Sequence, residues 1–419
     1  MKVCDVKYTM FGEARVRGWL AGHGSPLYVY DLDDIRERYR TFASAFSYPH
    51  TEFHYAIVCN KNPLIVAALG RLGAHIHANT PGDAFCAMAA GIAPSRIVYS
   101  GTNLNHEDMA FLLSNGIALN VDSVDQLSAI AALRGKTNPT TDVGLRLFVT
   151  GGAARIGVAR AELGAAVRIA GAGGIRVTRL HMYVGTNTRR VESFVNCLNE
   201  LVSAAETLPE LESIDIGGGY GIAYDKSERE LDVMALGRFA SEAALELSQR
   251  VGRTIRLLVE PGRILVGPAG SLYVTVVSVK ERGGRRYVGV DSTVGNLVVP
   301  SVYHMHHRIR PISVRGETLE VPTDICGNTT HSRDFLGRDL KLPSLAIGDT
   351  LCISDVGAYG YAMSSHFLNR PRPPELVVDG DREILATRRE TFEDLMRTHN
   401  LDAALLAASR LDPRQAGVR

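Results

Sequence analysis

Between residues 52 and 260, short runs rich in β-branched residues alternate with amphipathic stretches, and this alternation constrains the fold more than any other feature. Eight runs are predicted to be strands: residues 52–58, 74–78, 96–101, 117–123, 143–149, 179–185, 213–217 and 255–260. Several stretches between them end in Gly, which commonly terminates a helix. Eight successive strand–helix units predict an α/β fold, a closed (β/α)8 TIM-type barrel. An open doubly wound sheet is the alternative, although no GxGxxG motif follows an early strand.

The pattern changes after residue 265, where apolar and polar residues alternate without long helices between them. This alternation predicts a C-terminal antiparallel β domain, either a β-sandwich or a β-barrel. The strand-like segment "SPLYVYDL" near the N-terminus either pairs with this domain or leads into the barrel. We therefore predict a barrel over residues 30–268, a β domain formed by residues 1–29 and 269–385, and a helical tail over residues 386–419.

Composition and charge indicate an ordinary globular protein, with 45% of the 419 residues hydrophobic and 22% charged. The formal net charge of +1 gives no reason to expect nucleic acid or an anionic membrane as a partner. No apolar run reaches the roughly 18–20 residues that span a bilayer, and the N-terminal sequence lacks the apolar core of a signal peptide. The six cysteines are scattered, with no CxxC pair, so we expect a cytoplasmic protein with reduced thiols.

Three motifs follow predicted strands at the end of a barrel where active sites form. The first, "GGGYG" from Gly217 to Gly221, allows backbone N–H groups to approach an anion, although such a run is also typical of a tight turn. The second, "EPGR", places Glu260 and Arg263 at this same end of the barrel, where they could bind a ligand. The alternative is that the two residues form a structural salt bridge. The third holds Tyr359 between two glycines. Together they predict a cradle for a phosphorylated, nitrogen-containing ring.

Histidines form the other notable cluster of polar residues. His75 and His77 have the period-2 spacing that places both on one face of a strand, and His54 and His181 also fall in predicted strands. Two such histidines can bind a metal ion, but no carboxylate or Cys at ligand spacing completes the site. We therefore predict no metal ligands and expect these histidines to fill the barrel or to contact a cofactor.

In this order, the motifs "YAIVCN", "DIGGGYG", "EPGRILVGPAG" and "GAYGYAMSSHF" resemble those of the fold-type III pyridoxal-phosphate decarboxylases, which have an alanine racemase-type barrel. The diaminopimelate decarboxylases are the more similar branch, and ornithine decarboxylase is a more distant one. The resemblance covers roughly residues 25–385. It implies a barrel with an added β domain, pyridoxal phosphate as cofactor, an amino-acid-like substrate, and a homodimer whose active sites are shared at the interface.

The resemblance also implies which residues bind the cofactor. The residues at the family's phosphate-binding positions are Gly217, Gly218, Gly219, Arg263 and Tyr359. Glu260 stands where the family holds the pyridine nitrogen, an interaction that makes the ring an electron sink. The cofactor-binding part of the family pattern is therefore present.

The reactive part of the family pattern is changed. Val58 stands at the position of the Schiff-base lysine, His77 at that of an aspartate, and Tyr183 at that of the ring-stacking histidine. Tyr can still stack on a ring. In the loop that supplies a cysteine across the family's dimer interface, Thr330 replaces the cysteine and His331 the acid. These substitutions imply that the catalytic candidates are His77, Tyr183, Thr330 and His331, around a pocket in which Val58 forms an apolar wall.

Two further positions bear on the substrate and on the missing lysine. Val299 replaces the arginine that grips a substrate carboxylate in the family, which argues against diaminopimelate as the substrate. Lys61 lies three residues after Val58 and is expected to be a solvated surface lysine, although its long side chain could in principle swing back.

Three functions remain open from the sequence. The first is a decarboxylase-like enzyme of small-molecule, amino-acid-derived biosynthesis that binds pyridoxal phosphate, or a cofactor–substrate adduct, without the usual covalent lysine. The second is a catalytically inactive homologue that regulates or dimerises with an active decarboxylase. The third is a metal-dependent or cofactor-free enzyme that uses His75 and His77. The retained phosphate cradle and the new polar residues favour the first.

Overall fold

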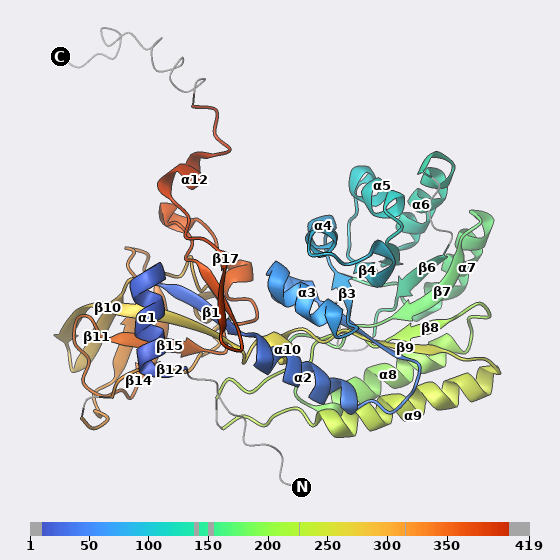
Figure 1. Cartoon of the computed structure of the whole chain (residues 1–419). Helices are drawn as coiled ribbons and strands as arrows, with labels where there is room; N and C mark the ends of the chain where they lie inside the picture. The colour runs from blue at the N-terminus through green and yellow to red at the C-terminus, as the bar shows by residue number, and fades with distance from the viewer. Residues whose placement is uncertain (1–10, 138–141, 150–154, 226, 315, 402–419) are drawn as a thin grey trace.

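The computed structural model describes residues 11–137, 142–149, 155–225, 227–314 and 316–401. Two parts lie side by side, a barrel surrounded by helices and a β domain, and the segment that carries α12 (Phe392–Met396) extends from the β domain (Figure 1). None of the described helices is long and apolar enough to cross a membrane.

Eight parallel strands close into the barrel predicted from the sequence. They are β2 (Thr51–Ala56), β3 (His75–Ala78), β4 (Ile97–Ser100), β5 (Ala118–Val121), β6 (Asp142–Arg146), β7 (Arg176–His181), β8 (Ser213–Asp215) and β9 (Arg256–Val259). Strand β9 pairs with β2 and closes the ring. All eight predicted strands are present, and their observed ends differ from the predicted ones by a few residues.

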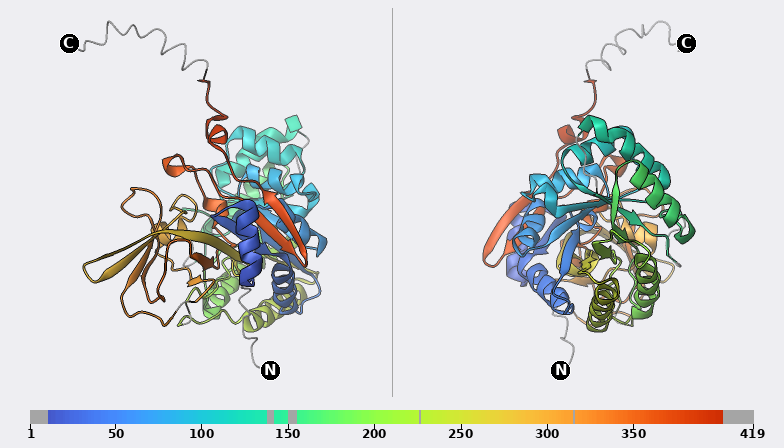
Figure 2. Two further views of the ribbon diagram at one scale, coloured as in Figure 1. Left: turned by 60° about the vertical axis from the view of Figure 1, so that its left-hand side comes forward. Right: turned by 90° about the vertical axis from the view of Figure 1, so that its right-hand side faces the viewer.

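Helices surround the barrel, as the right-hand view of Figure 2 shows. They are α2 (Leu32–Ser44), α3 (Pro63–Arg71), α4 (Pro81–Ala89), α5 (His106–Ser114), α6 (Val124–Thr137), α7 (Leu163–Ala172), α8 (Val191–Ala205), α9 (Val233–Val251) and the short α10 (Arg263–Val266). Single 3-10 turns are η1 (Ile57–Cys59), η2 (Pro94–Arg96), η3 (Arg160–Glu162), η4 (Tyr361–Met363) and η5 (Phe367–Asn369).

Local sequence signals explain where several of these helices begin and end. Helix α4 starts at a capping box in which Thr80 and Asp83 exchange side-chain and backbone hydrogen bonds, with Pro81 as the first helical residue. Helix α9 ends at Gly252, which adopts the left-handed conformation with φ of 69°. These caps satisfy backbone groups at the helix ends and fix where α4 begins and where α9 ends.

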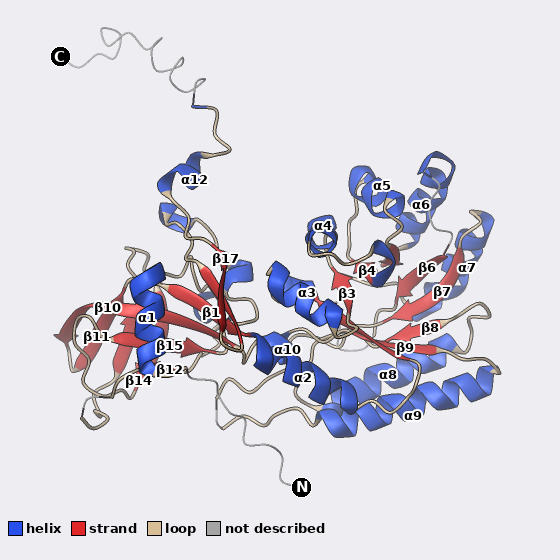
Figure 3. Ribbon diagram, in the orientation of Figure 1, coloured by secondary structure: helices blue, strands red, loops and turns tan. Residues whose placement is uncertain are grey.

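The β domain is a nine-stranded sheet, and most of its strand pairs are antiparallel, as predicted (Figure 3). Its strands are β1 (Leu27–Asp31), β10 (Gly270–Arg282), β11 (Arg285–Val290), β12 (Ile309–Pro311), β13 (Thr323–Cys326), β14 (Phe335–Leu340), β15 (Thr350–Ser354), β16 (Glu375–Asp379) and β17 (Arg382–Thr387). Two pairs are parallel, β1 with β16 and β11 with β13. The sheet is therefore mixed at these two places.

Strand β1 joins the two parts of the molecule. It pairs with β10 and β16 in the sheet, and Asp31 at its end caps helix α2 of the barrel part. Tyr28 and Tyr30 belong to the large core that extends through the barrel, whereas Leu27 and Val29 pack in a smaller core on the other face. This alternation is the period of a strand that is buried on both faces. The segment "SPLYVYDL" therefore both pairs with the β domain and leads into the barrel.

The terminal segments differ in part from the expected division. Helix α1 (Glu13–His23) precedes β1 and packs Trp19 against the smaller core, so the N-terminal part of the β domain contributes a helix as well as a strand. In the predicted helical tail, strand β17 continues to Thr387 and the only described helix is α12 (Phe392–Met396). Residues 402–419 lie outside the described part of the chain. Helix α11 (Val299–Tyr303) lies between β11 and β12.

Candidate active site

A cavity of 230 Å³ lies at the carboxyl ends of the barrel strands. Its wall combines residues that follow β2, β3, β6, β7, β8 and β9 with one tyrosine of the β domain. The lining residues are Ala56, Val58, Cys59, His77, Asn79, Arg146, Ile156, His181, Tyr183, Thr186, Asn187, Gly218, Gly219, Tyr220, Glu260, Gly262, Arg263 and Tyr359. The cavity therefore gathers most of the site residues predicted from the sequence.

The glycine loop after β8 accepts no side chain. Gly217 and Gly219 have φ angles of 67° and 103°, in the region that L-residues rarely adopt. A Cβ atom at Gly217 would come 2.1 Å from the carbonyl oxygen of Met182, and one at Gly219 would come 2.1 Å from that of Gly185. A Cβ atom at Gly218 would lie 2.8 Å from a backbone carbonyl oxygen of the loop that follows β9. The loop thus needs glycine, and its bare backbone borders the cavity.

Arg263 places a buried cation at the same end of the barrel. It is the first residue of α10, its residue exposure is only 8%, and its Nη1 donates a short hydrogen bond to the hydroxyl of Tyr224. The guanidinium lies 4.5 Å from the ring centroid of Tyr359, whose backbone N–H donates to the carbonyl of Cys59. These contacts fix the guanidinium beside the glycine loop, an arrangement that suits a phosphate group.

Glu260, which lines the cavity, forms a buried carboxyl pair with Asp215. Burial, and after it the charge of Glu260, raise the pKa of Asp215 to about 7. Burial raises the pKa of Glu260 to about 8, against the lowering influence of Asp215, Arg146 and Arg179. One oxygen of Asp215 accepts the backbone N–H of Gly217, which couples the pair to the glycine loop. At neutral pH Glu260 is therefore mostly protonated.

Two buried histidines face Glu260 across the cavity floor. Nε2 of His77 lies 3.2 Å from Oε1 of Glu260, and Nε2 of His181 lies 3.5 Å from the same oxygen. Burial lowers the pKa of His181 to about 4 and holds the pKa of His77 well below its ordinary value, so both imidazoles are neutral. Within the described residues no ring nitrogen of either histidine has a hydrogen-bond partner. Both imidazole rings can therefore form hydrogen bonds with a bound molecule.

Tyr183 and Arg146 form one side wall. The Tyr183 hydroxyl is 2.9 Å from Oγ1 of Thr186, and the Arg146 guanidinium lies 5.4 Å from the centroid of the Tyr183 ring. Tyr183 was predicted from the sequence, and it is in the cavity. Arg146 and Tyr224 were not predicted as site residues. Arg146 could have been found, because it is a charged residue within the otherwise apolar predicted strand 143–149.

Val58 reaches the cavity from a turn and not from the strand. Strand β2 ends at Ala56, so the predicted end of this strand at residue 58 is wrong; residues Ile57–Cys59 form the 3-10 turn η1. The side chain of Val58 lines the cavity, and the residue is 38% exposed. No lysine is among the described residues that line the cavity. Lys61 is exposed and is not part of the lining, so its position does not support a role as a substitute.

Thr330 and His331 are not brought to this cavity within the chain. Both lie in the loop after β13, away from the lining residues, and the His331 ring packs edge-on against Phe367 at 5.3 Å. Val299 is buried at the start of α11 and is also outside the lining. The prediction that the loop acts across a homodimer interface stays a prediction.

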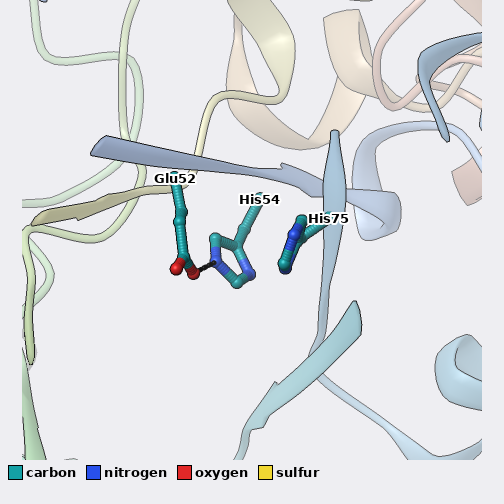
Figure 4. Close-up of side chains that lie close together, drawn as sticks. All are labelled: Glu52, His54 and His75. Carbon is teal, nitrogen blue, oxygen red and sulfur yellow. Dashed lines mark ion pairs between the residues drawn. The ribbon is translucent and has the colours of Figure 1, made fainter. Parts of the chain in front are cut away.

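His75 and His77 do not form one cluster, although they occupy one face of β3. His77 belongs to the group with His181 and Glu260, whereas His75 lies with Glu52 and His54 (Figure 4). In the barrel, Ala56 is the register partner of His77 and His54 that of His75, so the two histidines lie in successive layers. The described residues therefore form no site in which both histidines hold one ion. Each group does contain a glutamate, so the expectation that no carboxylate accompanies these histidines is wrong.

The fold and this cavity define a barrel enzyme scaffold with a site for a phosphorylated cofactor. A family model described as the pyridoxal binding domain of pyridoxal-dependent decarboxylases matches residues 32–267. The chain belongs to this family, whose cofactor is pyridoxal phosphate.

Relatives and solved structures agree with this assignment. The chain is 33% identical to the diaminopimelate decarboxylase of Methanothermobacter thermautotrophicus, over 97% of this chain and 99% of the relative. It is 30% identical to that of Aquifex aeolicus, over 88% and 90%. The crystal structure of the Helicobacter pylori diaminopimelate decarboxylase complexed with L-lysine matches with a TM-score of 0.84 and 27% identity, over 93% of this chain and 99% of that chain.

The residues of the cavity fit part of the family's cofactor. The glycine loop and the fixed guanidinium of Arg263 suit the phosphate. Glu260 lies at the cavity floor, and its Oε1 accepts no hydrogen bond from the described residues, so a ring nitrogen can contact it. Val58 lines the wall, and no described lining residue is a lysine.

Proposed function

We propose that this chain is a decarboxylase-like lyase that acts on an amino-acid-like substrate and holds pyridoxal phosphate, alone or as a preformed adduct with the substrate, without covalent attachment to the protein. A single observation carries the proposal. The cavity retains the glycine loop, Arg263 and Glu260, while an apolar valine side chain borders it at residue 58 and no described lining residue is a lysine.

Each part of the cofactor has residues of this chain to hold it. Backbone N–H groups of Gly218 and Gly219, together with Arg263, would bind the phosphate, and Tyr359 keeps the guanidinium in place. Glu260 would contact the ring nitrogen, and Tyr183 offers an aromatic face. Bound pyridoxal phosphate supplies an electron sink for a bond that breaks at the substrate α-carbon.

The chain's own residues supply proton transfer and exclude water. Glu260 holds a proton at neutral pH, and Oε1 of this group lies 3.2 Å from Nε2 of the neutral imidazole of His77. Glu260 would therefore donate a proton to a bound molecule, and the neutral imidazole of His77 would accept one from it. The apolar side chain of Val58 and the buried aromatic residues limit the water that reaches the reacting centre.

A catalytically inactive homologue that pairs with an active decarboxylase is the second candidate. It is favoured by Val58 and by Thr330 and His331, because these departures lie at reactive positions of the family pattern while the fold is retained. The buried cluster of His77, His181 and Glu260 argues for chemistry at the site, because buried polar groups that lack hydrogen bonds within the described residues are costly unless they serve a ligand.

One experiment separates these possibilities. The purified full chain is mixed with pyridoxal phosphate, its visible spectrum is recorded before and after borohydride, and any reduced adduct is mapped to a peptide. We expect a bound cofactor that is removed by dialysis and leaves no reduced adduct on the protein. Failure to bind the cofactor, with stable pairing to a lysine-bearing relative, would support the second candidate. A reduced adduct at Lys61 would contradict the proposal.

A further inference from the structure

A second group of potential ligands lies at the other end of the barrel. Glu52 and His54 project from β2, and His75 projects from the neighbouring strand β3 to the same side (Figure 4). His54 and His75 are register partners in the parallel strand pair. The cofactor cavity is bordered by Ala56 and His77, one layer nearer to the carboxyl ends of the same strands. The group is thus outside the site described above.

The three side chains converge on one point. One carboxylate oxygen of Glu52 and one ring nitrogen from each histidine all lie within 4.8 Å of one another. The His54 and His75 rings are 4.9 Å apart between centroids. Ligand atoms in a tetrahedral site with bonds of about 2 Å stand about 3.3 Å apart. Small side-chain rotations therefore bring this group to coordination distance, without a change in the backbone of either strand.

His54 is a buried side chain that makes no hydrogen bond within the described residues. Its residue exposure is 1%, and neither ring nitrogen makes a hydrogen bond with the described residues. Its Nε2 is 3.5 Å from Oε2 of Glu52, which is longer than a good hydrogen bond. A buried polar group without a partner is costly, and native structures satisfy almost all of them. A further atom between the side chains would therefore satisfy the buried ring of His54.

Glu52 is already oriented for this role. Its other oxygen, Oε1, accepts a hydrogen bond of 2.9 Å from Arg256 of β9. The arginine thus holds the carboxylate in place and leaves Oε2 directed at His54. Hydrogen bonds of this kind orient the ligands of known metal sites. Strands β9, β2 and β3 are neighbours in the ring, so the group spans the place where the barrel closes.

We propose that Glu52, His54 and His75 bind a divalent transition-metal ion, with Zn²⁺ as the probe, at the amino-terminal end of the barrel. Two imidazoles and one carboxylate suit Zn²⁺, Co²⁺ or Ni²⁺, whereas Mg²⁺ and Ca²⁺ prefer oxygen ligands alone. Three protein ligands leave one coordination position for water. The ion ties β2 to β3 beside the barrel closure and stabilises the folded chain, because it binds only the native arrangement.

The test uses the purified full chain after treatment with a chelator. Zn²⁺ is titrated by calorimetry, Co²⁺ binding is followed by visible absorption, and the melting temperature is measured with and without Zn²⁺. We expect one equivalent of metal at micromolar concentration or below, a tetrahedral Co²⁺ spectrum and a higher melting temperature. Glu52→Gln and His75→Gln should each weaken binding by at least about tenfold. Both residues are half-buried, so these variants are expected to fold even where a change at His54 does not.

Two matched variants control for other histidines. His106→Gln changes an exposed histidine at the start of α5 and should leave binding unchanged. His77→Gln removes a member of the group with His181 and Glu260, and it should also leave binding unchanged. The proposal is overturned if no metal binds in the micromolar range. It is equally overturned if His77→Gln abolishes binding while His75→Gln preserves it.

Discussion

Nε2 of His77 lies 3.2 Å from Oε1 of Glu260 at the floor of the cavity, with both residues buried. Burial lowers the pKa of the histidine and raises that of the glutamate, so both groups are mostly neutral at neutral pH. The pair therefore avoids a buried charge in the free protein, and it still offers a proton and an acceptor to a bound molecule. We expect this pair to govern how stability depends on pH, and the glycine loop and Arg263 to govern the affinity for the cofactor.

Above about pH 6.5, where the buried histidines are neutral in the folded and the unfolded chain, the stability of the cofactor-free protein should fall as the pH rises. The pKa of Glu260 is raised from 4.5 to about 8 in the folded chain, so the folded state holds this proton more tightly than the unfolded state. The contribution is present below pH 4.5 and is lost as the pH rises through about 8. Between about pH 6.5 and about pH 8 we expect a loss of about 2 kcal/mol from Glu260, because one pKa unit is worth about 1.4 kcal/mol.

Urea denaturation at several pH values checks this prediction. Glu260→Gln removes the titrating group and should flatten the dependence between these pH values. Asp215 keeps part of the slope, since its pKa is also raised, to about 7. An unchanged slope in the variant would show that Glu260 is ionised in the folded chain.

Val58→Lys should introduce covalent attachment of the cofactor. Val58 lines the cavity, so a lysine there would place its amine inside the pocket that holds the glycine loop and Arg263. We expect borohydride to fix pyridoxal phosphate to residue 58 in this variant and to no residue of the unchanged chain. Peptide mapping by mass spectrometry identifies the modified residue. Val58→Met, which supplies an unbranched side chain without an amine, is the control, and labelling elsewhere in the Val58→Lys variant would argue against this geometry.

Arg263→Ala should weaken binding of pyridoxal phosphate by more than about tenfold. The guanidinium is buried and held by Tyr224 and Tyr359, and hydrogen bonds to a charged group contribute about 1.5–3 kcal/mol. Equilibrium dialysis or fluorescence titration measures the affinity. Arg190→Ala is the control, because the Arg190 side chain is 81% exposed and is not among the residues lining the cavity. Equal affinity in both variants would show that Arg263 does not bind the phosphate.

Gly219→Ala should destabilise the chain and reduce cofactor binding. The new Cβ atom would lie 2.1 Å from the carbonyl oxygen of Gly185, at a φ of 103°. Such backbone strain costs roughly 1–3 kcal/mol before the clash is added. Gly171→Ala is a matched control, because Gly171 lies within α7 and no atom lies within 4 Å of the place where its Cβ would stand.

The control should be neutral or stabilising by roughly 0.5–1 kcal/mol, since Ala is the better helix former. Thermal unfolding compares the two variants with the unchanged chain. A Gly219→Ala variant as stable as the unchanged chain would mean that the loop can relax away from Gly185.

Much of the barrel could be predicted from local patterns. Eight apolar runs separated by amphipathic stretches correspond to β2–β9, because strand burial and helix amphipathicity are set by short-range periodicity. The ends of these strands could not be predicted in the same way. Strand β2 stops at Ala56, whose N–H donates to the carbonyl of Pro261, and the N–H of Tyr359 reaches back to Cys59. These long-range hydrogen bonds hold the turn that carries Val58.

By itself, the sequence determined the barrel, the added β domain and the glycine loop, because glycine runs and periodic apolar runs carry their constraints locally. Only the tertiary structure decided which polar groups meet. It divided His75 from His77 into two clusters, brought Arg146 and Tyr224 to the site, and left Thr330 and His331 outside the cavity. The physical reason is that closure of the barrel sets residues of distant strands in layers, and the distances and pKa values within those layers depend on burial by the whole fold.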